Sequence, residues 1–375
     1  MITPFIRALL LIATIIPQLT YAQLLTDEAA KNHIKQGMDK LYNMEFTEAD
    51  QHFLKVKNAY INHPVGELLH AIQIQWQNMP VEKNPIALNK YLTALEKSKK
   101  QAENLYKEGK YKEEATFFLI ATYGYIALSY NYQKEYSKAV LEAKQAYGYL
   151  KEGMKYKNPD FLFTTGLYNF YRIQYPETHP VVKPVMLFFE GGNKALGLQQ
   201  LESAIQKATF SREEAAIYLT NIYLKYQNDR PKALHTAAYL GKKYPNNKLF
   251  TMRYAETLLL NGQFTEAEKQ IDKLKNTPSN SLYWLAIHTF EGILAEIRDK
   301  DKPAAMQHYQ KAAQMVADRR YTSEYKGLAY LGLARNYYHL NQPEKAKLYA
   351  KKCQEIAEYH WVIEEAKQWE KKSNR

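Results

Sequence analysis

Apolar residues recur every three or four positions along the chain from residue 23 onward, and polar residues occupy most of the positions between them. This period is typical of helices that bury one face, whereas half-buried strands alternate with a period of two. No segment keeps the period of two over a convincing length. The sequence therefore predicts an all-α protein.

Small residues repeat at two fixed offsets in three stretches of the helical pattern. The three sets are Ala127, Ala139 and Ala146; Ala255, Ala267 and Leu274; and Ala334, Ala346 and Cys353. Small side chains at such offsets let two antiparallel helices cross closely. The spacing resembles that of the tetratricopeptide repeat (TPR), a helix–turn–helix unit of about 34 residues. The resemblance implies a right-handed superhelical solenoid that works by binding other molecules.

The repeats also predict how the chain is divided. We expect residues 23–357 to form a solenoid of about eight helix pairs, with residues 174–191 inserted inside the fourth pair. Residues 358–375 are expected to form a capping helix and a tail, because an end repeat needs one buried face and one polar face. No glycine–serine linker interrupts the pattern, which favours one continuous array.

Residues 1–22 carry the features of a secretory signal peptide. Arg7 precedes an apolar run from Ala8 to Ile16, Pro17 ends that run, and Ala22 supplies a small residue before the expected cleavage site. An uncleaved membrane anchor is the alternative, but the run is shorter than the roughly 20 residues that span a bilayer. Because no cysteine lies at the cleavage site, a lipoprotein anchor is excluded. We expect an exported protein in the periplasm, or secreted, that begins at Gln23.

The chain carries 51 Lys and Arg against 39 Asp and Glu, a formal net charge of +12. Basic proteins bind nucleic acid, anionic membranes or acidic polymers. Here the lysines alternate with glutamates at helical spacing, which is typical of solvated helix faces, and export argues against nucleic acid. The remaining excess would favour peripheral contact with an anionic membrane surface or a cell-wall polymer.

Residue patterns that carry catalysis are missing from the sequence. None of the ten histidines lies at the i, i+4 spacing, with an intervening glutamate, that a zinc peptidase needs. Adjacent carboxylates such as Glu113 and Glu114 point about 100° apart on a helix and would not converge on one atom. Cys353, the single cysteine, falls at a buried repeat position. The sequence predicts no catalytic residue, no metal site and no cofactor.

In TPR arrays the concave face is lined mainly by the first helix of each pair, which suggests where a partner would bind. Tyrosines are frequent on this predicted face, and each offers a flat apolar body with a polar tip. The alternative is that these tyrosines pack between helices. Counting from the repeats, the expected partner-binding residues are Asn131, Tyr132, Tyr218, Ile222, Lys225, Tyr226, Met252, Glu256, Arg335, Tyr338 and His339.

A second resemblance involves residues 166–171 (Gly-Leu-Tyr-Asn-Phe-Tyr) and 191–198 (Gly-Gly-Asn-Lys-Ala-Leu-Gly-Leu). A similar element occurs in some bacterial TPR proteins and in a eukaryotic TPR-like family associated with the mitochondrial outer membrane, although those favour Asp and Arg where this chain has Asn193 and Lys194. The two glycines fit a tight turn into a helix that Asn193 caps. Together with the tyrosine- and lysine-rich composition, the chain resembles exported proteins of Bacteroidetes-type bacteria.

The apolar end of the insertion is too hydrophobic for a freely solvated loop. It either plugs the groove of the solenoid or forms part of a partner site. The residues concerned include Val185, Met186, Phe188 and Phe189.

These features favour a non-catalytic scaffold or adaptor of the cell envelope that binds a protein or peptide. The alternative is an outer-membrane-associated glycan-binding protein with TPR helices. That class resembles this chain in its helices and aromatic surfaces, but its members carry a lipid-bearing cysteine and long loop insertions that this chain lacks.

Overall fold

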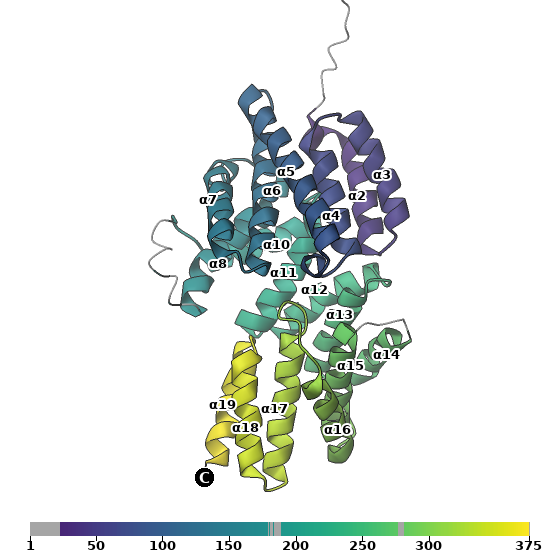
Figure 1. Cartoon of the computed structure of the whole chain (residues 1–375), viewed down its shortest axis with the longest axis vertical. Helices are drawn as coiled ribbons and strands as arrows, with labels where there is room; N and C mark the ends of the chain where they lie inside the picture. Colours follow the sequence, from purple (N-terminus) through teal and green to yellow (C-terminus); the bar gives the residue numbers. More distant parts are fainter. Residues whose placement is uncertain (1–22, 179, 181–182, 184–188, 277–280, 375) are drawn as a thin grey trace, which may run out of the picture. The chain divides into compact units, whose positions relative to one another are not determined.

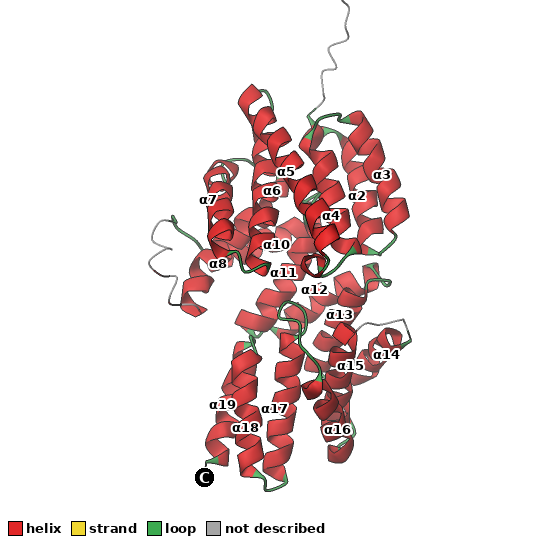
Figure 2. Ribbon diagram, in the orientation of Figure 1, coloured by secondary structure: helices red, strands yellow, loops and turns green. Residues whose placement is uncertain are grey.

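A computed structural model describes residues 23–178, 180, 183, 189–276 and 281–374. These residues form helices joined by turns and contain no strand, which confirms the predicted all-α class (Figure 2). Short 3-10 helices at Leu24–Thr26, Val81–Lys83 and Pro159–Phe161 precede longer ones. The α-helices are α2 (Glu28–Tyr42), α3 (Phe46–Ala59), α4 (Pro64–Gln77), α5 (Pro85–Glu108), α6 (Lys112–Tyr132), α7 (Tyr136–Gly153), α8 (Leu162–Thr178), α10 (Lys194–Lys207), α11 (Arg212–Ile222), α12 (Arg230–Lys243), α13 (Lys248–Leu260), α14 (Phe264–Lys275), α15 (Ser281–Ile293), α16 (Lys302–Gln314), α17 (Ser323–His339), α18 (Pro343–Ile356) and α19 (His360–Ser373).

Consecutive helices pack against each other two by two, as in a TPR array (Figure 1). Gly37 of α2 lies against Phe53 of α3 in the first pair. Helix α19 packs on α17 and α18 at the end of the array, where the sequence predicts a capping helix. The remaining pairs are α4–α5, α6–α7, α8–α10, α11–α12, α13–α14, α15–α16 and α17–α18.

The contacts divide the chain into two compact units. Unit 1 combines the residues up to Gly37 with Thr47–Gly153, and unit 2 combines Met38–Phe46 with the residues from Met154 onward. One hydrophobic core extends through unit 2 from Phe170 of α8 to Ala366 of α19.

The small residues of the repeat lie at helix crossings in unit 2. Ala255, Ala267, Ala334 and Ala346 are fully buried, as the spacing predicts. Cys353 is also buried, and burial raises the pKa of its thiol to about 12, so the thiol stays protonated and unreactive. In unit 1 the pattern is looser, because Ala127 and Ala146 are only half-buried. The repeat frame is therefore tightest in the C-terminal half of the sequence.

The glycine-rich element joins α8 to α10 in the way its sequence predicts. Gly191 and Gly192 adopt positive φ angles of 49° and 132°, and the Asn193 side chain accepts a hydrogen bond from the Leu196 N–H at 3.0 Å. A Cβ on Gly197 would lie 2.7 Å from the backbone nitrogen of Phe170, so only glycine allows this approach of the two helices.

The insertion begins later than expected. Helix α8 continues through Pro176 to Thr178, so residues 174–178 are helical rather than part of a loop. At the other end, the carbonyl oxygen of Phe189 accepts a hydrogen bond of 2.9 Å from Arg172 Nε. The Tyr168 hydroxyl donates to the carbonyl oxygen of Glu190. Val185, Met186 and Phe188 lie outside the described residues, so the role of the insertion stays a prediction.

Replacing Gly197 with alanine is expected to destabilise unit 2 by about 1–3 kcal/mol. The added methyl group would meet backbone atoms of α8, which no side-chain rotation can relieve. Urea denaturation, monitored by tryptophan fluorescence, measures the change. Gly148→Ala on α7 is the control, because a Cβ there meets no atom within 4 Å. It should stabilise unit 1 by up to about 1 kcal/mol, and equal effects at both glycines would contradict the packing.

Candidate binding pocket

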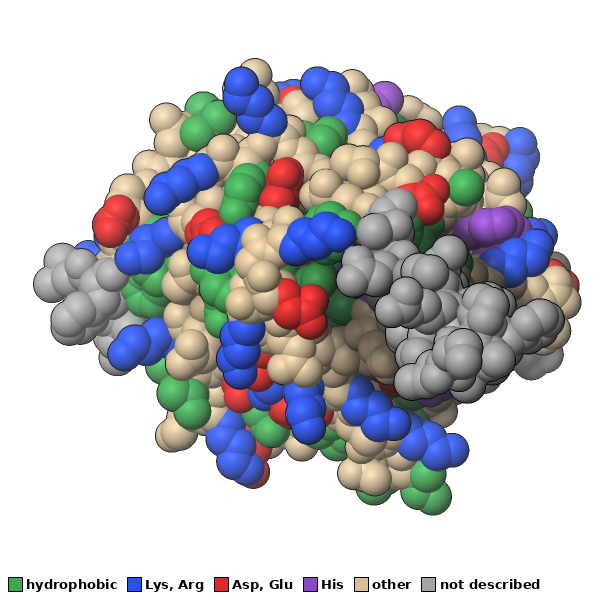
Figure 3. All heavy atoms as spheres, turned by 90° about the horizontal axis from the view of Figure 1, so that it is seen from above, with side chains coloured by type: hydrophobic (Ala, Val, Ile, Leu, Met, Phe, Trp, Pro, Cys, Tyr) green, Lys and Arg blue, Asp and Glu red, His purple; other side chains and the backbone are tan. Residues whose placement is uncertain are grey.

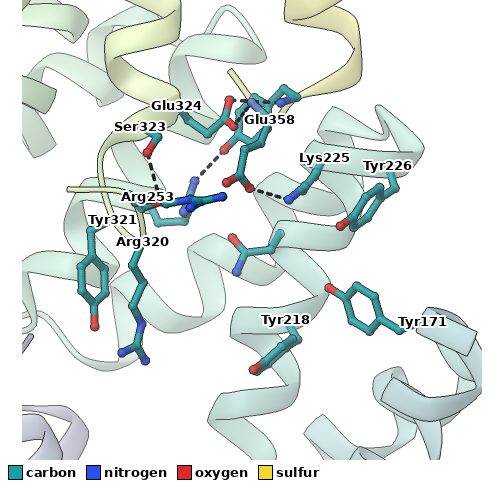
Figure 4. A pocket seen from close by; sticks show the side chains of 13 residues that line it. Tyr171, Tyr218, Lys225, Tyr226, Arg253, Arg320, Tyr321, Ser323, Glu324 and Glu358 are labelled. Carbon is teal, nitrogen blue, oxygen red and sulfur yellow. Dashed lines mark hydrogen bonds and ion pairs between the residues drawn. The ribbon is translucent and has the colours of Figure 1, made fainter. Parts of the chain in front are cut away.

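A pocket of about 170 Å³ lies in unit 2, among the first helices of several pairs and two loops (Figure 4). We call it the basic-aromatic pocket. Its walls come from α8, α11 and the turn after it, α13, the loop before α17, the start of α17, and the loop before α19. The lining residues are Tyr171, Tyr218, Asn221, Lys225, Tyr226, Arg253, Arg319, Arg320, Tyr321, Ser323, Glu324, Glu358 and Tyr359.

A π-helical turn, Tyr223–Gln227, extends α11 and carries two of the lining residues, Lys225 and Tyr226. The turn ends with the Asn228 N–H donating to the carbonyl oxygen of Tyr223, five residues earlier, and Asn228 itself adopts a φ of 49°. π-turns within α-helices are rare and are frequently found at functional sites. The periodicity of the sequence does not predict this turn.

Beneath the pocket, the carboxylate of Glu256 is buried and satisfied by three neighbours. Arg253 Nη1 lies 2.6 Å from Glu256 Oε2 and also donates to the Tyr359 hydroxyl at 2.7 Å. The hydroxyls of Tyr359 and Tyr325 donate to the two oxygens of Glu256 at 2.7 and 3.2 Å. A buried charge needs such partners because it has lost its hydration. The network therefore fixes the Arg253 guanidinium at the floor of the pocket.

The loop before α19 is attached to the opposite wall by two carboxylates. Glu358 pairs with Lys225, and Glu324 accepts hydrogen bonds from the N–H groups of Glu358 and Tyr359. Burial and the nearby Glu358 raise the pKa of Glu324 to about 8. Burial alone would lower the pKa of Lys225, but Tyr226 and Glu358 outweigh it and the pKa is raised. Lys225 is therefore charged at neutral pH, whereas Glu324 is mostly protonated.

The pocket consequently holds more cationic than ionised acidic groups near pH 7. Its cations are Lys225, Arg253, Arg319 and Arg320, whereas the lining carboxyl groups are those of Glu358 and of Glu324, whose pKa is raised. Guanidinium groups bind carboxylates in a planar, two-point geometry. Tyrosine rings beside them supply apolar contact. The arrangement is suited to holding an acidic group that is attached to an apolar chain.

Three of the residues predicted to bind a partner meet in this pocket, namely Tyr218, Lys225 and Tyr226. All three lie on one first helix and its π-turn, where counting from the repeats works well. The repeat spacing does not predict Arg319, Arg320 and Tyr321, because they lie on an irregular loop outside the repeat frame.

Other predicted residues do not line an open face. Glu256 is 1% exposed, and Ile222 and Met252 are also buried, so these three residues do not line an open face as expected. The reason is that α17 and the loop before α19 supply Tyr325 and Tyr359, which cover Glu256.

Three of the predicted partner-binding residues, Arg335, Tyr338 and His339, lie near the end of α17 and contact helix α19. Arg335 bonds to Glu296 at 2.7 Å and to Glu365 of α19 at 3.0 Å. The rings of Tyr338 and His339 lie 5.3 and 5.7 Å from that of Trp369, also on α19. Arg335 and Tyr338 therefore serve helix packing, whereas His339 remains exposed.

Asn131 and Tyr132 belong to unit 1 rather than to the unit that holds the pocket. They lie at the end of α6, where Asn131 is exposed and Tyr132 is half-buried. Their role in binding a partner stays a prediction.

Two other kinds of functional feature were sought in the described residues, namely membrane-spanning helices and groups of metal-ligating side chains. Within the described residues, no helix is both long and apolar enough to cross a bilayer. The one described group of three metal-ligating side chains lies elsewhere in unit 2, on α15 and α16.

Comparison with known proteins gives only distant similarity. No family model matches the sequence, and no characterised protein matches it at a significant level. The crystal structure of yeast Tom70 aligns with 94% of this chain and 82% of its own, at 13% identity and a TM-score of 0.38. The crystal structure of the P58(IPK) TPR domain aligns with 92% of this chain and 98% of its own, at 15% identity and a TM-score of 0.27.

Replacing Glu324 with glutamine is expected to flatten the pH dependence of the stability of unit 2. The folded-state pKa of about 8 lies above the ordinary 4.5, so folding favours the protonated carboxyl. Its contribution to stability is fully present below about pH 4.5 and is lost as the pH rises through 8. The free energy of unfolding of the wild type should fall by at most about 1.4 kcal/mol per pH unit between pH 4.5 and 8. The fall is smaller if water reaches the Glu324 carboxyl group.

Urea denaturation at a series of pH values tests this expectation. Glu214, whose pKa burial raises to about 7, is present in both proteins and cancels in the comparison. Identical pH profiles for the wild type and Glu324→Gln would show that Glu324 is already ionised at neutral pH.

Proposed function

We propose that this chain is an exported, non-catalytic binding protein of the cell envelope that holds an acidic peptide segment of a protein partner. The binding site is the basic-aromatic pocket of unit 2. The TPR-like pairing of helices supports a binding role, because such arrays present fixed side chains from several helices to one ligand. The signal-like residues 1–22 support export.

The observation that carries the proposal is the convergence of four cations and five tyrosines on one small cavity. Lys225, Arg253, Arg319 and Arg320 come from three different segments of the chain. A volume of about 170 Å³ is smaller than the roughly 300–1,000 Å³ of typical small-molecule sites. It fits one or two side chains, or a chain end, better than a cofactor. A Glu or Asp side chain, or the terminal carboxylate, of a longer peptide matches both the volume and the positive charge of the pocket.

One further face of the molecule shows no concentrated basic patch. On the face seen in Figure 3, Lys and Arg side chains are spread among Asp and Glu rather than gathered in one patch. A polyanion such as nucleic acid needs a continuous basic stripe. The local excess of cations in the pocket is therefore the feature that selects a ligand.

Glycan binding is the second candidate, because tyrosine rings also stack on sugar rings. Tyr171, Tyr218 and Tyr226 would supply that surface. A neutral sugar, however, has no anionic group that could pair with the guanidinium groups. Binding of an acidic peptide should depend on the positive charge of the pocket, whereas binding of a neutral sugar should not.

Fluorescence anisotropy with peptides of equal length, rich in Glu, Gln or Lys, tests the proposal. The Glu peptide should bind, and Arg319→Glu/Arg320→Glu should weaken it at least about tenfold, as expected for the loss of charge-assisted hydrogen bonds. Lys269→Glu on α14, an exposed cation that does not line the pocket, is the matched control and should change little. Equal binding of all three peptides, or binding of neutral oligosaccharides that ignores the charge reversal, would overturn the proposal.

Export is tested separately by mass spectrometry of the protein recovered from cells. The mature chain should begin at Gln23 and leave the membrane on carbonate washing. An intact Met1 in the carbonate-resistant fraction would contradict export with cleavage.

A further inference from the structure

Helices α15 and α16 bring two imidazoles and one carboxylate together in unit 2. His288 and Glu291 lie on α15, and His308 lies on α16. One ligand atom from each residue lies within 4.8 Å of the other two. None of the three lines the basic-aromatic pocket. The cluster therefore needs an explanation of its own.

The helix geometry explains why these side chains meet. Residues three apart on a helix share a face, so His288 and Glu291 project together. Helix α16 packs on α15 and supplies His308 to the same point. The His288 ring also lies against Trp284, with 5.7 Å between the ring centres. The positions of all three groups follow from the packing of one helix pair.

The inner nitrogens of both histidines are buried and contact the Glu291 carboxylate without a well-formed hydrogen bond. Nδ1 of His288 and Nδ1 of His308 lie 3.4 and 3.1 Å from Glu291 Oε2. Neither nitrogen has a hydrogen-bond partner among the described residues, although both atoms are inaccessible to water. Buried polar atoms are nearly always satisfied, so such a pair indicates a missing partner.

The two distances from Glu291 match edges of a tetrahedral metal site. With metal–nitrogen and metal–oxygen bonds of about 2.0–2.2 Å, neighbouring ligand atoms in a tetrahedron lie about 3.3–3.4 Å apart. The observed 3.1 and 3.4 Å are close to that separation. Two imidazoles and a carboxylate favour Zn²⁺ and its neighbours Co²⁺, Ni²⁺ and Cu²⁺ over Mg²⁺ or Ca²⁺, which prefer oxygen ligands.

Lys275 has two opposite effects on metal binding at this site. Its ammonium group lies 2.9 Å from Oε1 of Glu291, the oxygen that does not face the histidines. A partner on that oxygen holds the carboxylate in place and directs Oε2 toward the imidazoles. Its positive charge also repels a cation, so the site should be weaker than one with a neutral neighbour.

We propose that His288, Glu291 and His308 bind a divalent transition-metal ion of the Zn²⁺ type and thereby link α15 to α16. Three protein ligands leave a fourth position for water or for a group from a partner. The expectation from the sequence was that no metal site exists. It rested on pairs of histidines within one helix, whereas here the third ligand comes from the neighbouring helix.

Titration of the full-length, tag-free protein with Co²⁺ tests the proposal, because tetrahedral Co²⁺ has a strong visible absorption that Zn²⁺ abolishes by displacing it. One equivalent should bind and raise the melting temperature. His308→Ala and Glu291→Gln should each weaken binding at least about tenfold, while circular dichroism confirms that they remain folded. The control is His33→Ala/His52→Ala, which removes a pair of histidines in unit 1 whose Nδ1 atoms lie 3.2 Å apart. It should bind as the wild type does.

Three results would overturn the proposal. These are the absence of a tetrahedral spectrum, binding that persists in His308→Ala, and binding that disappears in His33→Ala/His52→Ala alone. If a variant on α16 fails to fold, Lys275→Gln gives an independent readout. Removing that positive charge should tighten binding several-fold at this site, and no change would count against it.

Discussion

Arg253→Met is expected to destabilise unit 2 by about 3–5 kcal/mol, the usual result of removing one partner from a buried ion pair. Glu256 is 1% exposed, so its carboxylate cannot recover the lost interaction from water without local unfolding. The hydroxyls of Tyr325 and Tyr359 would remain as donors, but neither carries a compensating charge. Urea denaturation in a Trp76→Phe background measures the effect, because Trp284, Trp361 and Trp369 then report on unit 2 alone.

The double variant Arg253→Met/Glu256→Gln separates charge from packing. Glutamine keeps an oxygen that accepts from the two tyrosines but removes the buried charge. This variant should therefore be clearly more stable than Arg253→Met alone, since replacing both members of a buried pair costs far less than breaking it. If the double variant is the less stable of the two, the network is not organised around the charge of Glu256.

Ala267→Trp is expected to cost about 3 kcal/mol or more, at or beyond the upper end of the usual range for overpacked cores. Ala267 is fully buried at the crossing of α13 and α14, and the repeat frame requires a small side chain there. An indole ring would force the two helices apart. The substitution adds a tryptophan and would change the fluorescence signal itself. Urea denaturation of this variant is therefore followed by circular dichroism.

Lys269→Trp on the same helix is the matched control. Its side chain is 68% exposed, and its contact with Glu266 is a surface ion pair of little energetic value. The change should stay within about 0.5 kcal/mol. Similar losses at both positions would mean that the repeat frame does not describe the packing of α14.

The sequence predicted the fold well because helix pairing depends on local periodicity. The offsets of Ala255, Ala267 and Ala334 place these residues at helix crossings, and the structure buries all of them. Gly197 was also identified correctly, since a close helix approach demands the smallest residue. The same pattern failed to predict that α8 runs through Pro176, because a proline lacks the N–H that continues a helix and is usually taken to end it.

The lining of the candidate pocket was predicted only in part. Lys225 and Tyr226 line it, at positions that the repeat spacing assigns to a first helix. Glu256 occupies the same face, yet it is covered by side chains from distant segments, which no count along one repeat can detect. Arg319 and Arg320 lie on an irregular loop, and the histidines on α15 and α16 meet only through the packing of two helices. Contacts that depend on tertiary structure lie beyond a single-sequence pattern.

Photo-crosslinking from the basic-aromatic pocket tests most directly whether this pocket binds an acidic segment of a protein. A benzophenone amino acid at position 218 should trap a discrete protein partner in the cells that naturally produce this chain. The same group at exposed position 235 on α12 should not. Adding Arg319→Glu/Arg320→Glu should abolish the adduct at 218. Adducts that form equally at both positions, that survive the charge reversal, or that contain only glycan would contradict the claim that the pocket binds an acidic segment of a protein.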